Sequence, residues 1–286
     1  MKKNILILFL IAFSVIFTNP CYAIKIGLQT DAETASVGTS VKGTIIDANN
    51  NTKVCDLEAM KGYEIRPYHN IIAIKIDGNF YKIKSDNIVI KPTENGFISA
   101  KAKWYRGNII VQNKKGKLTV INNVDIEDYI KGVVPAEMPP SWHAEAHKAQ
   151  AIAARSYALA NLGKRGSLGF DLNDTPADQA YGGASAETTK TNTAVDDTRG
   201  IVITYNMKVV CAYYSASAGG VSSSNAWGGN LPYIRSVPSF DENVKKNGHG
   251  VGMSQHGANN LAKEGYNAYQ ILQYFYNDVK FARMNS

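Results

Sequence analysis

The sequence predicts an α+β fold in which a β-rich N-terminal part leads into a mixed part of helices and hairpins, with short C-terminal helices. Short runs of β-branched or alternating residues, separated by turn residues, fill residues 24–122. An alanine-rich run with helical spacing occupies residues 142–162, and hairpins and short helices follow it in mixed order. We therefore divide the chain into a signal segment at residues 1–23, a β-rich part at 24–122 and a catalytic core at 123–286.

The N-terminal segment has the pattern of a secretory signal peptide. Lys2 and Lys3 precede an apolar run at residues 5–17, and residues 21–23 (CYA) offer a small-residue cleavage site. The run is too short to predict a transmembrane span, although an uncleaved signal would leave a membrane anchor. We expect a secreted or membrane-anchored protein whose mature chain begins at Ile24.

Composition and charge fit a protein of the cell exterior. The chain has 286 residues, of which 44% are hydrophobic, enough for a sizeable core. Its formal charge of +7 falls to about +5 without Lys2 and Lys3, a mild excess that suits an anionic cell wall and does not predict nucleic-acid binding. Outside the signal segment, Cys55 and Cys211 could pair in an oxidising compartment or pack separately as small hydrophobic residues.

The β-rich part contains several runs that read as strands. We expect strands at residues 24–28, 40–46, 71–76, 80–83, 88–90, 109–112 and 118–121. Asp77 and Gly78 lie between two of these runs and predict a tight hairpin. No cluster of catalytic residue types lies here, so this part is expected to serve as a scaffold or a recognition surface.

The residues around Glu137 are predicted to hold its carboxylate in a stiff turn. Asp125 is expected to cap a short helix over residues 126–131. Pro135 and Pro139 then fix φ and disfavour helix at the residues before them, so the helix is not expected to reach Glu137. A single glutamate in front of a helix is most often only a cap or a dipole partner, which makes this position unspecific by itself.

The alanine-rich run predicts a long helix starting near Trp142. Ser141 is the expected N-cap and Gly163 the expected stop. Arg155 lies on a mostly apolar face of this helix, where a guanidinium is expected to have an anionic partner.

No metal or cofactor site is predicted. His143 and His147 have the i, i+4 spacing of a zinc helix, but Glu145 stands one position too late for that motif. The glycines of residues 248–252 lack the Lys-Ser/Thr of a phosphate-binding loop and a dinucleotide-binding unit around them.

The remainder of the chain alternates between loops, hairpins and helices. Residues 170–183 form a polar, turn-rich loop that is a candidate cleft wall. We expect a hairpin at residues 198–205 and 209–214, a close-packed turn at 215–220, and helices at 255–264 and 268–277. Four aromatic residues could stack on sugar faces or belong to the core, namely Tyr181, Tyr214, Trp227 and Tyr233.

Six phrases, in order along the chain, resemble the successive motifs of the stage II sporulation protein D family, also called the SpoIID/LytB domain. They are IEDYIKGVVPAEMPPSW, KAQAIAARSYAL, DQAYGG, YYSASAGG, WGGNLPYIRSV and GHGVGMSQHGA, and the resemblance covers residues 24–281. It implies a cell-wall enzyme of a spore-forming, Gram-positive bacterium: a lytic transglycosylase that acts on peptidoglycan glycan strands, preferably strands stripped of peptide. It also implies a partner amidase or endopeptidase of the engulfment machinery.

The resemblance assigns roles to individual residues. Glu137 is implied as the catalytic acid, and Arg155 is implied to matter for function. Because a guanidinium in contact would lower the pKa of the acid, we expect Arg155 to orient substrate or a neighbouring group more than to contact Glu137. The other residues expected to bind substrate are Gln179, Tyr181, Ser215, Ser217, His249 and Gln255. Packing is an equal alternative for His249 and Gln255, and the two serines could simply pack in their turn.

The implied chemistry requires a protonated acid. A lytic transglycosylase can work with one carboxyl group, because the sugar's own C6 hydroxyl attacks and returns a proton to the acid. Glu137 should therefore be partly desolvated, which keeps it protonated near neutral pH.

The sequence is also compatible with two other functions. One is a non-catalytic, wall-binding amidase enhancer of the LytB type, which the short segment at residues 238–247 would suit, because family members usually carry a long insertion there. The other is a muramidase, which needs a second carboxylate opposite Glu137, with Asp178 and Asp241 as candidates.

Overall fold

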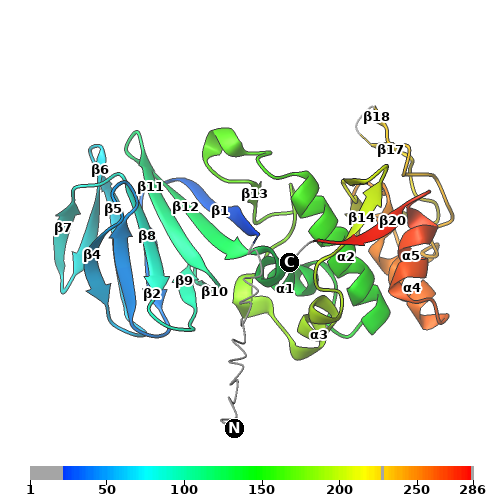
Figure 1. The fold of residues 1–286 in the computed structure, drawn as a ribbon, viewed down its shortest axis with the longest axis horizontal. Helices are drawn as coiled ribbons and strands as arrows, with labels where there is room; N and C mark the ends of the chain where they lie inside the picture. The colour runs from blue at the N-terminus through cyan, green and yellow to red at the C-terminus, as the bar shows by residue number, and fades with distance from the viewer. Residues whose placement is uncertain (1–21, 227–228, 285–286) are drawn as a thin grey trace, which may run out of the picture.

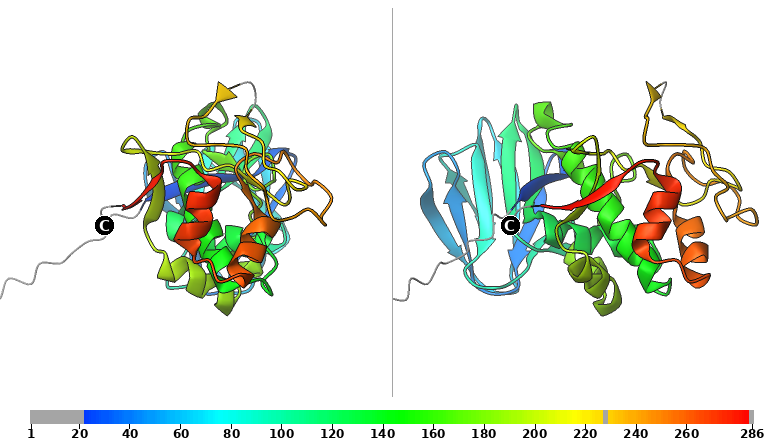
Figure 2. Two further views of the ribbon diagram at one scale, coloured as in Figure 1. Left: turned by 90° about the vertical axis from the view of Figure 1, so that its right-hand side faces the viewer. Right: turned by 45° about the vertical axis from the view of Figure 1, so that its right-hand side comes forward.

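The computed structural model describes residues 22–226 and 229–284, so most of the expected signal segment and Trp227 lie outside the described residues. Figures 1 and 2 show an elongated molecule with the β-rich part at one end and helices α4 and α5 at the other. The α+β fold class and the β-rich N-terminal part are confirmed. No helix in the described ranges combines the length and apolar character needed to cross a bilayer.

The first part is built from two sheets that pack face to face. Their orders are β13-β1-β12-β11-β8-β3-β4 and β10-β9-β2-β5-β6-β7. Alternate side chains of each sheet, such as Ile90 and Val111 on one and Ile65 and Ile74 on the other, are buried in one core. The strands are β1 Ala23–Ala32, β2 Ala35–Thr39, β3 Gly43–Asp47, β4 Thr52–Leu57, β5 Gly62–Tyr68, β6 Ile71–Ile76, β7 Asn79–Ile83, β8 Asn87–Pro92, β9 Ile98–Ala100, β10 Lys103–Tyr105, β11 Asn108–Lys114 and β12 Lys117–Asp125.

The hairpin predicted at Asp77 and Gly78 is confirmed. Strands β6 and β7 pair antiparallel, with Ile76 opposite Asn79. Both turn residues have positive φ, 48° for Asp77 and 85° for Gly78, as the tight turn of a two-residue hairpin requires.

The second part is arranged around helix α2, which packs against the other four helices and strand β14. The helices are α1 Ile126–Glu137, α2 Ala144–Ala160, α3 Thr189–Asp197, α4 Gln255–Lys263 and α5 Ala268–Phe275. The 3-10 turns are η1 Gly166–Leu168 and η2 Gly183–Ala186, and the strands are β13 Leu172–Asn173, β14 Ile201–Tyr205, β15 Lys208–Val209, β16 Tyr214–Ser215, β17 Asn225–Ala226, β18 Gly229–Asn230, β19 Met253–Ser254 and β20 Lys280–Arg283.

Helix α1 runs further than the sequence predicts. It begins as expected, because the Asp125 carboxylate accepts a hydrogen bond from the Glu127 backbone N–H at 2.9 Å. It then continues through Pro135 and makes Glu137 its last residue, so the predicted end at residue 131 and the predicted turn at Glu137 are wrong.

Packing explains how α1 tolerates its proline. Tyr129, Ile130, Val133 and Val134 are buried on α1, and this burial outweighs the one hydrogen bond that Pro135 cannot donate. The helix ends at Met138, which is extended because it precedes Pro139.

Helix α2 starts two residues later than predicted. Its N-cap is His143, whose Nδ1 accepts a hydrogen bond from the Glu145 N–H at 3.3 Å. Ser141 is not the cap, because it lies inside a turn closed by the Trp142 N–H donating to the Pro139 carbonyl at 3.0 Å.

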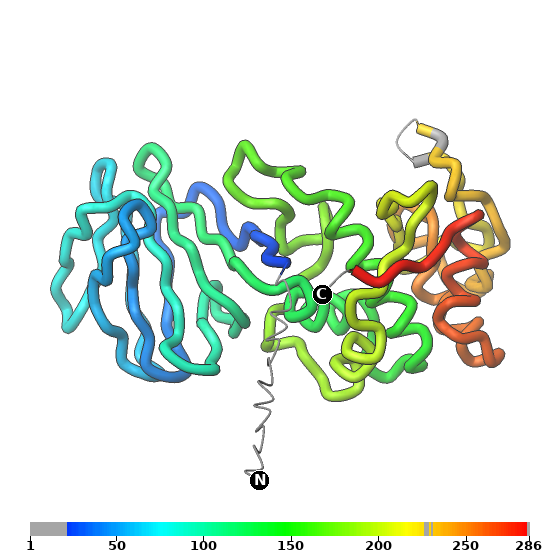
Figure 3. The backbone as a smooth tube through the Cα atoms, in the orientation of Figure 1, coloured from blue at the N-terminus to red at the C-terminus, as the bar shows by residue number. Residues whose placement is uncertain are grey.

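The two parts share a sheet and a core. After α2 the chain returns to the first part (Figure 3). There β13 pairs parallel to β1, with Ile26 opposite Leu172. The hydrophobic core between the sheets continues into α1, α2 and α3. Cys55 and Cys211 are both free thiols.

Candidate active site

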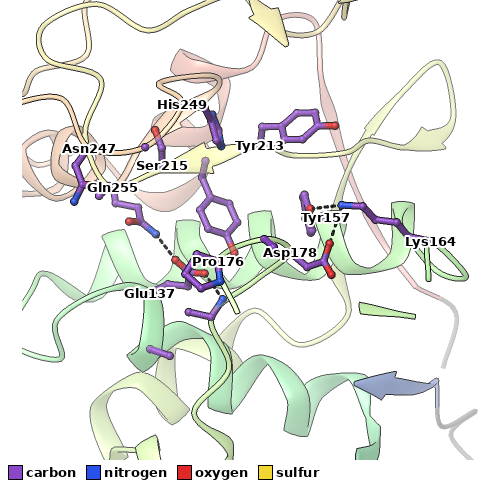
Figure 4. A pocket seen from close by; sticks show the side chains of 16 residues that line it. Glu137, Tyr157, Lys164, Pro176, Asp178, Tyr213, Ser215, Asn247, His249 and Gln255 are labelled. Atoms are coloured by element: carbon purple, nitrogen blue, oxygen red, sulfur yellow. Dashed lines mark hydrogen bonds and ion pairs between the residues drawn. The ribbon is translucent and has the colours of Figure 1, made fainter. Parts of the chain in front are cut away.

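A cavity of about 600 Å³ opens where the C-terminal end of α1 meets loops from the second half of the chain. Glu137 lies on its wall (Figure 4). The lining consists of Ala136, Glu137, Tyr157, Lys164, Pro176, Ala177, Asp178, Ala180, Tyr213, Tyr214, Ser215, Ala216, Asn247, Gly248, His249 and Gln255. The loop predicted as a cleft wall at residues 170–183 supplies four of these residues, from Pro176 to Ala180.

Three donors from separate segments hold the Glu137 carboxylate. The Ala180 backbone N–H donates to its Oε1 at 2.7 Å, and the Gln255 side-chain amide donates to its Oε2 at 3.2 Å. The Tyr214 hydroxyl donates the third hydrogen bond. Glu137 is thereby fixed from a loop, from the first residue of α4 and from β16.

The pKa of Glu137 is raised above its ordinary value. Burial raises it, because a charged carboxylate loses solvation, and the three donors lower it by a smaller amount. The carboxyl group is therefore partly desolvated, as expected for the acid, while donors remain in place to stabilise the anion once the proton has left.

Gln179 acts on Glu137 through Tyr214. The buried Gln179 amide donates to the Tyr214 hydroxyl at 2.8 Å and to the Ala154 carbonyl at 3.2 Å. Since the Tyr214 oxygen accepts from Gln179, its own proton is directed to Glu137. Gln179 itself does not line the cavity, so the structure makes it a positioning residue and not a substrate contact, contrary to the expectation.

The cavity has one other carboxylate on its border, that of Asp178. Its Oδ1 pairs with the Lys164 Nζ at 2.8 Å, and its Oδ2 accepts from Arg165 and from the Asn173 N–H. Burial would raise the pKa of Asp178, but these hydrogen bonds outweigh it and hold the pKa below its ordinary value. Asp178 is thus an ionised, doubly paired group, and its side chain is 0% exposed.

Asp241 organises the short segment at residues 238–247. It accepts hydrogen bonds from the Ala218 and Gly220 N–H groups at 2.7 and 2.8 Å and from the hydroxyls of Ser239 and Ser254. It is buried and does not line the cavity, whereas Asn247, at the end of the same segment, does.

Ser215 and His249 lie on the wall that carries the glycine-rich turn. The Gly250 N–H donates to the Ser215 hydroxyl at 3.1 Å, and the Val251 N–H donates to His249 Nδ1 at 2.9 Å. Burial lowers the pKa of His249 and favours its neutral form. The turn needs glycine at Gly248, which has φ of 94° and would place a Cβ 2.9 Å from that of Ser215.

Arg155 is placed away from the cavity. Its guanidinium is fully buried and makes two hydrogen bonds to the Glu127 carboxylate, at 2.8 and 2.7 Å, and a third to the Ile201 carbonyl at 2.9 Å. The expected anionic partner is Glu127. Of the two roles expected for Arg155, contact with substrate is not available to a side chain enclosed by α1, α2 and β14, whereas orienting a neighbouring group, Glu127, fits these contacts.

Tyr181 and Ser217 are also structural in their placement. The buried Tyr181 donates its hydroxyl proton to the Asn122 side chain at 2.8 Å and packs against Gly132 of α1. The Ser217 hydroxyl donates to the Lys245 carbonyl at 2.9 Å. Neither lines the cavity, so the prediction of substrate contact is not supported for them. Tyr233 is likewise buried in the second core.

The histidines of α2 serve the backbone. His143 caps the helix, and the Nε2 of His147 is hydrogen-bonded to the Pro139 carbonyl at 3.0 Å. Among residues 22–226 and 229–284, no group of three or more His, Cys, Asp or Glu side chains is arranged to hold a metal ion.

Several cavity residues have no counterpart in the sequence analysis. Lys164, Tyr157, Tyr213 and Asn247 all line the cavity. Lys164 directly follows Gly163, the predicted end of the helix, and this position could have indicated a side chain at the edge of the cavity. The Ala180 N–H could not be found from residue types, because any residue offers such a donor.

Comparisons with known proteins find sequences similar to this chain. The family described as SpoIID, Stage II sporulation protein, matches residues 114–205, a range that contains Glu137 and Gln179 but not His249 or Gln255. An amidase enhancer of Bacillus subtilis (strain 168) is 36% identical over 169 residues, which is 58% of this chain and 22% of that protein. Stage II sporulation protein D of the same organism is 26% identical over 263 residues, 58% of this chain and 77% of that protein.

An uncharacterised protein of Brachyspira hyodysenteriae is 34% identical over 184 residues, which is 63% of this chain. The chain spans 49% of the length of that protein and 22% of the amidase enhancer, so these two relatives contain much that has no counterpart here.

Proposed function

Since the chain belongs to the SpoIID/LytB family, which gives it a role in sporulation or the cell wall, we propose that it is a lytic transglycosylase with Glu137 as its acid and base. Its substrate would be the peptidoglycan glycan strand, and the bond cleaved would join MurNAc to GlcNAc. The observation that carries the proposal is the Glu137 carboxyl group on the cavity wall, which burial and donors from two other segments hold in place and whose pKa burial raises.

The reaction would use one proton twice. Protonated Glu137 gives its proton to the glycosidic oxygen as the bond to MurNAc C1 breaks, which leaves an oxocarbenium-like sugar and a carboxylate. The carboxylate then takes the proton from the C6 hydroxyl as O6 bonds to C1. The products are a GlcNAc with a free hydroxyl and a 1,6-anhydro-MurNAc end, and no water is consumed.

The surroundings of Glu137 suit both halves of this cycle. Burial favours the protonated acid at the start, and the donors Ala180, Gln255 and Tyr214 are aimed at the charge that appears after proton transfer. These donors are held by the fold, so they need not reorganise during the reaction.

The placement of Asp178 and Asp241, the two candidates for a second catalytic carboxylate, argues against ordinary hydrolysis. A muramidase uses a partner carboxylate as nucleophile or as base. Asp178 is 0% exposed at its side chain and paired with Lys164 and Arg165, and Asp241 is outside the cavity. Neither is placed for attack on a sugar, whereas an internal O6 nucleophile needs no second carboxylate.

The test is an analysis of cleavage products. Purified protein without its first 23 residues is incubated with peptidoglycan that an amidase has stripped of peptide, and the new ends are identified by mass spectrometry. The proposal expects 1,6-anhydro-MurNAc ends from the wild type and none from Glu137→Gln, with strand binding retained. New reducing ends, or undiminished cleavage by Glu137→Gln, would contradict it.

A second function is favoured by one finding, the relative that is named an amidase enhancer. In this alternative the cavity binds glycan without cleaving it, and the protein stimulates a partner amidase outside the cytoplasm. It predicts no anhydro ends under any condition and a faster release of peptides by the amidase when the protein is added.

A further inference from the structure

One end of the cavity carries a fixed positive charge. Lys164 Nζ lies 2.8 Å from Asp178 Oδ1, donates to the Tyr157 hydroxyl at 3.2 Å, and stands 5.7 Å from the centre of the Tyr157 ring. In Figure 4 these three residues lie to one side of Glu137, and Gln255 and Asn247 lie to the other.

The charges at this end do not cancel. Asp178 is paired with two cations, Lys164 and Arg165, so the group as a whole keeps one positive charge. Both residues line the cavity, but the Asp178 side chain is 0% exposed and that of Lys164 is 39% exposed, so the cation is the accessible partner of this pair.

The ammonium group is held in place but not saturated. An ammonium has three N–H donors, and the described residues supply partners for two of them, the Asp178 carboxylate and the Tyr157 hydroxyl. Because the Tyr157 oxygen accepts from Lys164, the phenol keeps its own proton for donation. The two groups together can bind an anion with two oxygens.

We propose that Lys164 and Tyr157 form a subsite for the free lactyl carboxylate of a muramic acid residue. The proposal rests on the proposed function, because it takes the glycan strand as the ligand. It adds the two residues that would distinguish a stripped strand from one that carries peptide, and the charge by which they would do so.

The chemistry of the strand supports this choice of ligand. A muramic acid stripped of peptide ends its lactyl group in a carboxylate, whereas a muramic acid that carries peptide has a neutral amide at the same carbon. Lys164 and Glu137 line the same cavity. The proposal places the muramic acid ring with its glycosidic oxygen at Glu137 and its lactyl group towards Lys164. Lys164 would therefore favour stripped strands by charge.

The experiment measures binding and does not depend on turnover. Glu137→Gln protein is titrated calorimetrically with glycan fragments that have free lactyl carboxylates, and with the same fragments after conversion of the carboxylates to methylamides. We expect the free acids to bind roughly tenfold more tightly, the size of effect typical of a charged hydrogen bond in a partly exposed site.

Two further substitutions in the Glu137→Gln protein test whether Lys164 causes the preference for free carboxylates. Lys164→Met should abolish the tenfold difference, and Lys164→Arg should keep most of it. Lys101→Met is the matched control, because Lys101 pairs with Asp174 at 2.7 Å with a similarly exposed side chain but does not line the cavity. The control should leave the preference unchanged.

The outcomes separate this inference from the proposed function. A preference that survives in Lys164→Met, an equal loss of affinity for both fragments, or no binding of either fragment overturns the subsite. A preference that depends on Lys164, in a protein whose wild type forms no anhydro ends, supports the subsite and contradicts the transglycosylase reaction.

Discussion

Burial and hydrogen-bond donors shift the pKa of the Glu137 carboxyl group in opposite directions, and a substitution can remove a donor while burial stays. Burial raises its pKa, and the donors Ala180, Gln255 and Tyr214 lower it. The protonated, active form of Glu137 is lost as the pH rises through its pKa. The fall of activity at high pH, which is the high-pH limb of the activity profile, should therefore report the pKa of Glu137.

Tyr214→Phe should move that limb to higher pH. The substitution deletes a hydroxyl that stabilises the carboxylate and leaves burial in place, so the pKa of Glu137 rises further. The measurement is kcat/KM against pH on stripped glycan strands. Tyr213→Phe, in a ring that lines the same cavity and contacts His249, is the matched control and should leave the limb where it is.

Glu137→Gln should become more stable than the wild type as the pH rises. Above about pH 4.5 an unfolded chain loses the glutamate proton, while the folded chain, whose pKa is raised, keeps it. Wild-type stability therefore falls with pH through this window, and the neutral amide has no such dependence. Urea unfolding of both proteins between pH 4 and pH 8 measures the difference; a constant difference would show that the pKa is not raised.

The sequence predicted the residues of the candidate site from their motifs, but it did not predict which of them face the cavity. Glu137, Ser215, His249 and Gln255 were all expected from their motifs and all line the cavity. Arg155, Gln179, Tyr181 and Ser217 come from the same motifs but support the site from within the core, because a motif records which residues are needed and not which side faces the substrate.

At the scale of elements, the buried Arg155–Glu127 pair joins α1, α2 and the start of β14. Glu127 also accepts a hydrogen bond from the Gly200 N–H at 3.0 Å, and Arg155 reaches the Ile201 carbonyl. These contacts fix the angle between the helix that carries Glu137 and the helix beneath the cavity.

Arg155→Met should lower the free energy of unfolding by about 3–5 kcal/mol, because it leaves the Glu127 charge buried without a partner. Arg106→Met is the matched control: Arg106 pairs with Glu187 in the same two-bond geometry but is 34% exposed, so its loss should cost only about 1 kcal/mol. Denaturant unfolding gives both values. Equal losses of stability in the two variants would contradict this role of the Arg155–Glu127 pair. A double variant, Arg155→Met with Glu127→Gln, that is no more stable than Arg155→Met alone would contradict it as well.

The sequence predicted element boundaries correctly where a neighbouring capping residue sets them. It failed where packing against distant segments determines where a helix ends. Asp125 caps α1 as predicted, and α4 begins at the predicted residue, Gln255. The continuation of α1 through Pro135 depends on burial against distant segments. Strand β5 was missed because Pro67 interrupts an otherwise alternating run. Helix α3 was missed because its threonine-rich sequence has a weak helix preference.

At the scale of the whole molecule, the β-rich part and the part with the cavity share one core. The cluster that contains Ile26 and Ile65 also contains Tyr129, Ala151 and Val195, and β13 completes the sheet of β1. The β-rich part therefore supports the loop that supplies the Ala180 N–H.

A fragment of residues 123–286 should consequently fail to fold. It would expose the face of α1 that packs on the sheets and would lose the strand partner of β13. Amide hydrogen exchange on the fragment and on the chain of residues 24–286 compares them. Protected amides in α1 and α2 of the fragment, at the level seen in the longer chain, would show that the two parts fold independently.

The central claim is that bond cleavage uses the sugar's own hydroxyl and the proton of Glu137. The most direct measurement is to digest stripped glycan strands in water enriched in heavy oxygen and to weigh the new ends. The account predicts ends that are lighter by one water and carry no label, formed by the wild type and not by Glu137→Gln. Labelled reducing ends would mean that water attacks, and would contradict it.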